Sequence, residues 1–322
     1  MKPNEYLLLY ASNIPVSGKE GSAIYALDKG VVYQIPNVFI DLIKEWELEP
    51  FEMVSKKFED QADILAQYVE FIVNEDLGFF TDTPEFFPRL NIAYEHGGTI
   101  NSATVAYNGK FVLTDVIQKL DLLNCKYLEL IIDLEFCTFA DLEKLLVPIS
   151  GTTVREIRLL TKCPSDVSQF HLMQFLNQNK KLASISFCQA GFLNKTEINF
   201  CKVNFLPISL TEFILNYNQY NTLIINREFF LESAFYNTTY FNKVCIDFEG
   251  NIKNGLMLEE NFGNVITVSL DQIVTQDDFR SLWFTSPDNI EWMKDSELRY
   301  CLFSPLKENF NSEKIRKSIT IR

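Results

Sequence analysis

The first 80 residues alternate apolar and polar positions in a way that predicts short strands followed by helices. The runs at 6–10, 22–27 and 31–35 are rich in β-branched and aromatic residues, which is typical of strands. Residues 28–30 read Asp-Lys-Gly and predict a tight hairpin turn between the last two runs. The apolar run at 6–10 is too short for a signal peptide, so we expect a first strand there.

Three stretches after residue 36 show helical spacing instead. The first, 37–46, has Asn37 as its predicted N-cap, and the second has Pro50 at a first-turn position. The third, 61–75, repeats apolar residues every three or four positions, which predicts an amphipathic helix. The apolar face of that helix consists of Ile64, Leu65, Tyr68, Phe71 and Ile72.

Strand and helix patterns alternate beyond a linker with two prolines at 83–88. The predicted strands start about 25 to 30 residues apart, which is roughly the length of one strand–helix unit. We therefore predict a parallel sheet, either open or curled into a partial barrel. No glycine-rich phosphate loop follows a strand, which argues against a nucleotide site of the common kinds. The predicted strands are 102–108, 126–136, 154–160, 182–188 and 210–217, and the predicted helices are 112–124, 139–149 and 165–179.

Alternation in 126–136 separates an apolar face from a carboxylate face. Leu128, Leu130 and Ile132 fall on the side that helices cover, and Asp133 and Glu135 fall on the other side, near the carboxyl end of the strand. Barrel enzymes build their sites at that end.

Arg158 occupies the comparable place on the next predicted strand and is a candidate partner for one of these carboxylates. Asp133, Glu135 and Arg158 therefore form either an acid/base or cation site or a structural ion pair in a polar lumen. No third group is recognisable in sequence, which favours the ion pair.

Composition and charge restrict the partners. At 322 residues the chain predicts two or three compact units, and its net charge is −14. No basic cluster is present to neutralise phosphates, so we expect no nucleic-acid partner. A negative field favours a basic or neutral polypeptide partner. No apolar run is long enough to cross a bilayer, so we expect no membrane partner and a cytoplasmic location.

Seven cysteines are scattered through the chain, and the closest pair lies twelve positions apart. No CxxC spacing occurs, so these residues predict reduced, buried thiols rather than ligands. The two histidines, His96 and His171, leave little material for a zinc site or a His-based triad.

The first 80 residues resemble the RiPP recognition element, a small winged-helix module at the front of many maturases of ribosomally synthesised peptides. The resemblance rests on SAIYALDKGVVYQIPN at 22–37 and on a helix that ends in LGFFTD at 77–82. It implies that a leader peptide adds a strand at 31–35 and packs against the helix at 62–73. The implied peptide-binding residues are Val31, Val32, Tyr33, Gln34, Ile35, Leu65, Tyr68 and Ile72. The alternative is a module that only packs on its neighbour.

The last third is similar to the SPASM-domain proteins of grasp-with-spasm peptide systems, which accompany ATP-grasp ligases. The shared elements occur in the family's order over about 60 residues: NKVCIDFEGNIKN at 242–254, FGN at 262–264, LW at 282–283, NIE at 289–291 and KDSELRY at 294–300.

Departures from that family decide the expected chemistry. Its members place cysteines where this chain has Gly255, Met293 and Ser296, and Cys301 stands alone after the last motif. The stretch 91–108 contains no cysteine where a radical SAM enzyme carries CxxxCxxC. An iron–sulfur cluster needs several converging thiolates, so we predict no cofactor and no metal site.

These observations predict an α/β protein of three segments: a winged-helix peptide-recognition domain (1–82), a degenerate radical-SAM-like partial barrel (83–238) and a degenerate SPASM-like domain (239–322). The leading hypothesis is a non-catalytic accessory protein that binds a precursor peptide and acts with an ATP-grasp ligase. Two alternatives stay open: a peptide-modifying enzyme with a cluster-free site in the barrel, and an interaction scaffold unrelated to peptide maturation.

Overall fold

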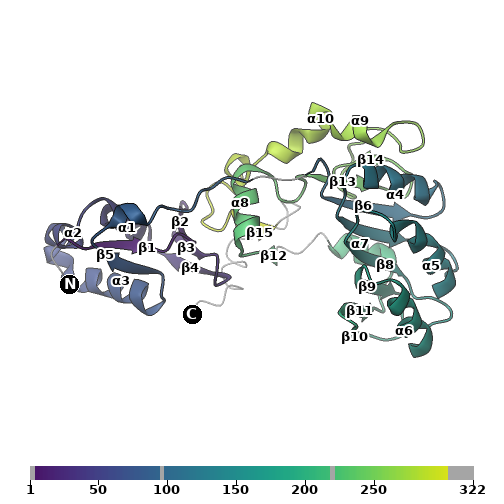
Figure 1. Ribbon diagram of the computed structural model, residues 1–322, viewed down its shortest axis with the longest axis horizontal. Helices are drawn as coiled ribbons and strands as arrows, with labels where there is room; N and C mark the ends of the chain where they lie inside the picture. Colours follow the sequence, from purple (N-terminus) through teal and green to yellow (C-terminus); the bar gives the residue numbers. More distant parts are fainter. Residues whose placement is uncertain (1–3, 95–97, 218–221, 304–322) are drawn as a thin grey trace. The chain divides into compact units, whose positions relative to one another are not determined.

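The computed structural model describes residues 4–94, 98–217 and 222–303 (Figure 1). The protein is mixed α/β, with one eight-stranded, mostly parallel sheet, smaller antiparallel sheets and several helices. The chain divides into two compact units, each made of segments that are distant in sequence. Unit 1 comprises 1–95, 221–238 and 285–322, and unit 2 comprises 96–220 and 239–284.

Unit 1 is built on a three-stranded antiparallel sheet in the order β2-β3-β4. Its strands are β2 (Asn13–Ser17), β3 (Ser22–Ala26) and β4 (Val31–Ile35), and β1 (Tyr6–Leu9) pairs separately with β5 (Gly78–Thr81). Three helices follow β4: α1 (Asn37–Leu48), α2 (Phe51–Lys57) and α3 (Ala62–Asn74). The later segments add β12 (Thr222–Leu223), α8 (Arg227–Phe235) and β15 (Leu302–Phe303).

Both faces of the unit 1 sheet are buried. Ile24, Ala26 and Ile35 face a core that α1 and α3 complete with Phe39, Ile43, Trp46 and Ile72. Ala23, Tyr25 and Val32 face a second core, which α8 and the segment 290–302 complete with Phe230, Met293, Leu298 and Cys301. All five residues of β3 are therefore buried, and the late segments are part of the same unit as the first strands.

Several expectations for the first segment change. The hairpin turn at 28–30 is confirmed, with Gly30 at a φ of 65°. The run at 6–10 does form a strand, but that strand pairs with β5, and β2 was not predicted because Pro15 interrupts its pattern.

The predicted caps of the first two helices also move by one residue. Asn37 is not an N-cap, because Pro36 holds that position and the Asn37 side chain accepts a hydrogen bond from Ser22 Oγ at 2.6 Å. Pro50 is the N-cap of α2 rather than a first-turn residue.

Unit 2 contains the eight-stranded sheet in the order β10-β11-β9-β8-β7-β6-β13-β14. Strands β6 to β9, β11 and β13 are parallel, and β10 and β14 are antiparallel edges. The strands are β6 (Ser102–Tyr107), β7 (Tyr127–Ile132), β8 (Glu156–Lys162), β9 (Leu182–Cys188), β10 (Asn194–Ile198), β11 (Cys201–Phe205), β13 (Lys243–Ile246) and β14 (Ile252–Lys253). The helices are α4 (Leu113–Leu122), α5 (Phe139–Leu146), α6 (Gln169–Gln178), α7 (Leu210–Tyr217), α9 (Leu270–Val274) and α10 (Asp277–Arg280).

The predicted strand–helix alternation of unit 2 is confirmed from β6 to β9. On β7, Leu128, Leu130 and Ile132 are buried, as the alternation predicted. One prediction is wrong, because 210–217 forms the helix α7 rather than a strand. Leu210 of this helix packs on the other face of the sheet, against Ile131 and Leu160.

The two units differ from the segments 1–82, 83–238 and 239–322. Residues 221–238 and 285–303 lie in unit 1, because their apolar side chains cover the second face of the β2-β3-β4 sheet. Residues 239–284 lie in unit 2, where β13 extends the parallel sheet beside β6. Among the residues that the structure describes, no helix is long and apolar enough to cross a membrane.

Candidate functional site

The strand β4 lies at an edge of the unit 1 sheet and carries five of the predicted peptide-binding residues. Leu27 N donates to Ser12 O and Gly18 N donates to Gly21 O, so the odd-numbered residues of β3 direct their backbone groups to β2. Its even-numbered residues therefore bond β4 at the partners Val31, Tyr33 and Ile35. By the same alternation, the N–H and C=O groups of Val32 and Gln34 face away from β3.

These outward groups make β4 a template for another strand. Val32 and Gln34 have no backbone hydrogen-bond partner among the described residues. An edge strand with unpaired backbone groups and no proline can add a further strand. The opposite edge, β2, contains Pro15, which lacks the N–H donor and discourages pairing.

A row of aromatic rings runs from β4 along α3 and forms the wall beside this edge. Tyr33 of β4 contacts Phe71 edge-to-face at 5.6 Å between ring centroids, and its hydroxyl donates to Glu75 Oε2 at 3.0 Å. Phe71 lies 6.0 Å from Phe39, which stacks on Tyr68 at 4.1 Å. The half-buried rings of Tyr33, Phe71 and Tyr68 supply apolar surface next to the backbone groups of β4.

The structure changes which predicted side chains are available to a ligand. Leu65 and Ile72 are buried in the core, so they support the wall from behind instead of touching a peptide. Val32 and Ile35 are also buried, one on each side of the sheet, and offer backbone groups only. Tyr33 and Tyr68 remain partly exposed, and Phe71 joins them as a wall residue that the predicted set left out.

A groove between α1 and α3 lies next to this wall. It holds a pocket of about 170 Å³ whose apolar lining includes Val38, Leu42, Ile64 and Tyr68. Asp41 and Glu45 line the same pocket from α1. The groove was not predicted from the sequence. Its rims, Val38 on α1 and Ile64 on α3, are apolar residues that remain exposed in the structure.

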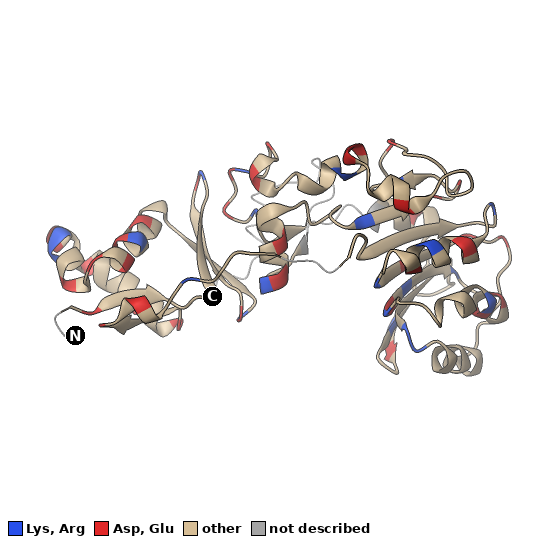
Figure 2. Ribbon diagram, turned by 45° about the horizontal axis from the view of Figure 1, so that its top comes forward, with Lys and Arg blue, Asp and Glu red and all other residues tan. Residues whose placement is uncertain are grey.

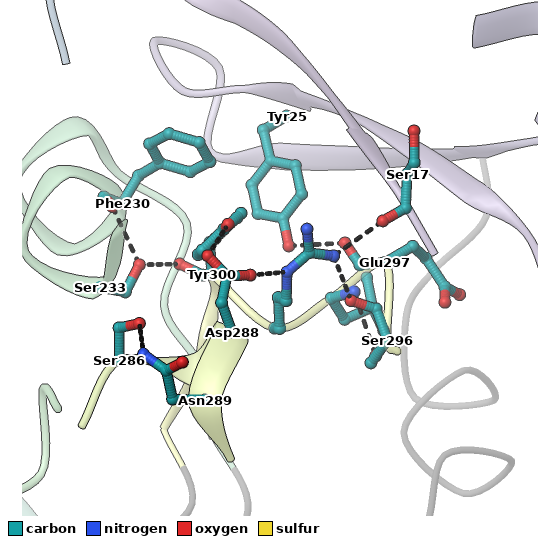
Figure 3. A network of polar contacts seen from close by, with 12 residues as sticks. Ser17, Tyr25, Phe230, Ser233, Ser286, Asp288, Asn289, Ser296, Glu297 and Tyr300 are labelled. Carbon is teal, nitrogen blue, oxygen red and sulfur yellow. Dashed lines mark hydrogen bonds and ion pairs between the residues drawn. The ribbon is translucent and has the colours of Figure 1, made fainter. Parts of the chain in front are cut away.

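The side chain of Gln34 connects β4 to the C-terminal segment of unit 1. Its Nε2 donates to Glu297 Oε1 at 2.9 Å. Tyr25 Oη donates to the backbone carbonyl of the same Glu297 at 2.8 Å (Figure 3). Arg299 extends this network by donating to Ser17 O and Asp288 Oδ1, each at 2.7 Å. The motif KDSELRY thus folds against the strands of unit 1 and holds β4 from the side opposite to α3.

The positions that the resemblance to SPASM-domain proteins assigned to cluster ligands do not fit an iron–sulfur group. Met293 is buried in the second core of unit 1, and Ser296 Oγ accepts the N–H of Leu298 at 3.1 Å. Burial raises the pKa of Cys301 to about 12, so the thiolate form is disfavoured. Gly255 belongs to unit 2 and has no side chain to offer. Within the described ranges, no three His, Cys, Asp or Glu residues gather as a metal site would require.

The candidate acid/base residues of unit 2 separate in the structure. Asp133 directly follows β7 and forms an ion pair with Lys162 at 2.6 Å, and Glu135 is exposed in the next loop. Arg158 lies in register with Glu129, four residues before Asp133, and bonds Glu156 Oε1 at 3.2 Å. Asp133 thus pairs with Lys162, four residues after Arg158 on β8, instead of with Arg158 as expected.

The histidines and cysteines considered in the sequence analysis form no further site among the described residues. The ring of His171 contacts Asp166 O at 2.7 Å near the start of α6, and His96 lies outside the described residues. Figure 2 shows Lys and Arg distributed over the elements of both units. Six of the seven cysteines are buried and Cys163 is half-buried, and all seven are free thiols.

Comparison with known proteins adds no relative to this picture. No family model matches the chain, and no curated protein matches its sequence. The candidate site therefore consists of the β4 edge, the aromatic wall of α3 and the α1–α3 groove.

Proposed function

We propose that this protein binds the leader part of a ribosomally made precursor peptide through the β4 edge, and acts as a non-catalytic accessory in peptide maturation. In this proposal unit 1 contains a winged-helix module like the RiPP recognition element. The sheet of unit 2 corresponds to a degenerate radical-SAM-like partial barrel, and residues 239–303 correspond to a degenerate SPASM-like region that is divided between the two units. The partner enzyme is an ATP-grasp ligase.

The observation that carries the proposal is the outward backbone of Val32 and Gln34 beside an aromatic wall. A peptide in extended conformation gains two or more backbone hydrogen bonds at such an edge, and its alternate side chains meet Tyr33, Phe71 and Tyr68. Each backbone bond contributes roughly 0.5–1.5 kcal/mol, and burial of one apolar side chain adds roughly 1.5–3 kcal/mol. These terms support reversible binding of a short segment.

The motifs of the last third have a structural role in this proposal. In unit 2, Asp247 Oδ1 accepts the N–H groups of Glu249 and Asn251 and organises the β13–β14 hairpin. In unit 1, Glu297 and Arg299 hold the β2-β3-β4 sheet. These hydrogen bonds stabilise the hairpin and the sheet without an iron–sulfur cluster.

The test uses the full chain and the short peptide encoded by a reading frame beside its gene. We expect the peptide to bind in isothermal titration, and Gln34→Pro to weaken binding about tenfold because it removes the outward N–H. The matched control Gln34→Ala loses the bond to Glu297 but keeps that N–H, so it should stay within about threefold of the wild type. Equal affinities of the Pro and Ala variants, or no peptide-encoding frame near the gene, would count against the proposal.

A second measurement guards against misfolding of the Gln34→Pro variant. Peptides N-methylated at successive positions are titrated into the wild-type protein. Methyl groups on residues that bond β4 should abolish binding, and methyl groups on the alternate residues should not. A uniform response to methylation at every position would contradict strand addition.

A further inference from the structure

The α1–α3 groove carries a combination of apolar and acidic groups that the proposed strand addition does not use. Its floor is formed by Leu42 and Leu65, and its rims by Val38 and Ile64, which are 59% and 48% exposed. Large apolar side chains this exposed on two facing helices leave surface that a ligand can cover. The pocket of about 170 Å³ is large enough for one bulky side chain.

A series of ring contacts connects the groove to the β4 edge. Tyr68 lines the pocket and stacks on Phe39, whose ring neighbours Phe71, and Phe71 contacts Tyr33 on β4. Val38 follows the last residue of β4 by only three positions. A peptide paired along β4 that continues past Ile35 therefore reaches the mouth of this pocket.

The acidic lining of the pocket favours a peptide with a positive charge. Asp41 and Glu45 both line the pocket, and its lining contains no Lys or Arg. Residues 37–74 hold nine carboxylate side chains and three lysines, so the helical layer is acidic as a whole. Lys44 and Lys57 bond Asp41 and Glu45 only at 3.2 and 3.5 Å, in exposed pairs that contribute little stability and that a peptide cation can replace.

We propose that the α1–α3 groove is a second subsite, which binds one bulky apolar residue of the peptide with a Lys or Arg next to it. The apolar side chain fills the pocket between Leu42 and Ile64, and the cation lies against Asp41 and Glu45. This subsite rests on the proposed function, because it takes the part of the peptide that extends beyond the strand paired with β4. It makes the preferred leader segment basic and apolar rather than acidic.

The experiment selects binders from a displayed library of random twelve-residue peptides on the full-length protein. We expect the enriched peptides to share an apolar residue adjacent to Lys or Arg, outside the segment that pairs with β4. Synthetic copies of one enriched peptide are then titrated into the variants. Ile64→Ala should weaken binding five- to tenfold, and Asp41→Asn about threefold at low salt, with the latter loss shrinking as salt rises.

Matched controls on α3 separate the groove from a general effect of substitution. Val73 is 49% exposed, like Ile64, but does not line the pocket, and Glu70 is an exposed acid on the same helix. Val73→Ala and Glu70→Gln should change the affinity less than twofold. Replacing the basic residue of the peptide by Gln should remove the difference between wild type and Asp41→Asn.

The outcomes distinguish this inference from the proposed function. If Gln34→Pro weakens the selected peptide but Ile64→Ala and Asp41→Asn do not, strand addition stands and the second subsite is wrong. If Gln34→Pro has the affinity of Gln34→Ala, the proposed function fails as well. Enriched peptides that are acidic, or that lack the apolar–basic pair, also overturn the inference.

Discussion

At the scale of single residues, burial determines the chemistry of the cysteines. Burial raises the pKa of Cys125 and Cys301 to about 12, and that of Cys137, Cys188 and Cys201 to about 11. It also raises the pKa of Cys245 and of the half-buried Cys163. A thiol whose pKa lies above the solution pH stays protonated, and the thiolate is the reactive form.

These thiols should therefore react slowly in the native protein. At pH 8 we expect iodoacetamide to label Cys163 first, and the six buried cysteines to be labelled only after unfolding in urea. Peptide mass spectrometry at increasing times measures each rate. Because the pKa values of the thiols are raised, the thiolate fraction grows as the pH rises from 8 towards 10. The rate of labelling of the native protein should therefore increase over this range. Rapid labelling of Cys301 at pH 8 would contradict its position in the second core of unit 1.

The prediction from sequence succeeded for residues whose neighbours along the chain set their environment. Leu128, Leu130 and Ile132 are buried because strand alternation alone assigns them to the helix-covered face. It failed for Asn37 because Ser22, fifteen residues away, engages the side chain that would have capped α1. The ion pair of Asp133 with Lys162 was missed for the same reason, since the register of β7 on β8 sets it.

At the scale of elements, the β13–β14 hairpin depends on one acidic residue. Asp247 accepts hydrogen bonds from two backbone N–H groups and from Asn251 Nδ2, and it pairs with Lys253 at 3.3 Å. Both partners of that ion pair are largely buried. Loss of the carboxylate leaves a buried cation and several unpaired donors.

We expect Asp247→Ala to lower the free energy of unfolding of unit 2 by about 2–3 kcal/mol. The control is Glu249→Ala in the same hairpin, because Glu249 forms an exposed ion pair with Lys110 that should contribute less than about 1 kcal/mol. Urea unfolding followed by circular dichroism, with amide exchange in β13 as a local probe, measures both. Equal losses for the two variants would refute the assigned role of Asp247.

The β10–β11 hairpin makes a prediction of the opposite sign. Its two-residue turn consists of Asn199 and Phe200, which have φ of 51° and 67°. Phe200 is 94% exposed, so it gains little from burial and sits in the left-handed region that favours glycine. Phe200→Gly should stabilise unit 2 by about 0.5–1 kcal/mol in the same urea experiment. Phe200→Ala keeps the strain and should not.

The helix α7 shows what the strand prediction overlooked. Leu210, Phe213 and Ile214 follow helical spacing, and these side chains pack on the face of the sheet that the main helices leave open. The hairpin β10–β11 was missed because the charged and exposed residues of β10 give no apolar alternation. Propensity and pattern therefore identified buried elements and failed at the sheet edge.

At the scale of the whole molecule, the chain order does not follow the compact units. Unit 1 needs residues 221–238 and 285–303, because Phe230, Met293 and Leu298 cover Tyr25 and Val32. The apolar run at 23–27 is typical of a strand that is buried on both faces, a signal that the sequence analysis did not use. Which segment would cover the second face was not predictable, since the covering residues lie about 200 or more positions away in sequence.

A fragment of residues 1–95 should therefore not behave as an independent domain. We expect it to bind the dye ANS and to aggregate, because the second face of its sheet is exposed. Unit 2, with residues 221–238 replaced by a Gly/Ser linker and the chain ended at 284, should fold cooperatively. A fragment 1–95 that is monomeric, does not bind ANS and melts cooperatively would contradict this account of unit 1.

The alternative enzyme hypothesis also has a test at this scale. Asp133→Asn removes the charge that pairs with Lys162, and Glu135→Gln changes an exposed loop residue. If these positions are structural, the double variant should leave peptide binding and the modified product unchanged in the producing cell. Loss of product with full binding and an unchanged melting temperature would favour a catalytic site in unit 2.

The most direct measurement of the central claim is amide hydrogen exchange of β4 in the full-length protein, with and without the precursor peptide at saturation. In the free protein, the N–H groups of Val32 and Gln34 should exchange faster than those of Val31 and Tyr33, because they face away from β3. The account predicts that the peptide slows exchange at Val32 and Gln34 at least tenfold. Bound peptide without protection of these two amides would contradict it.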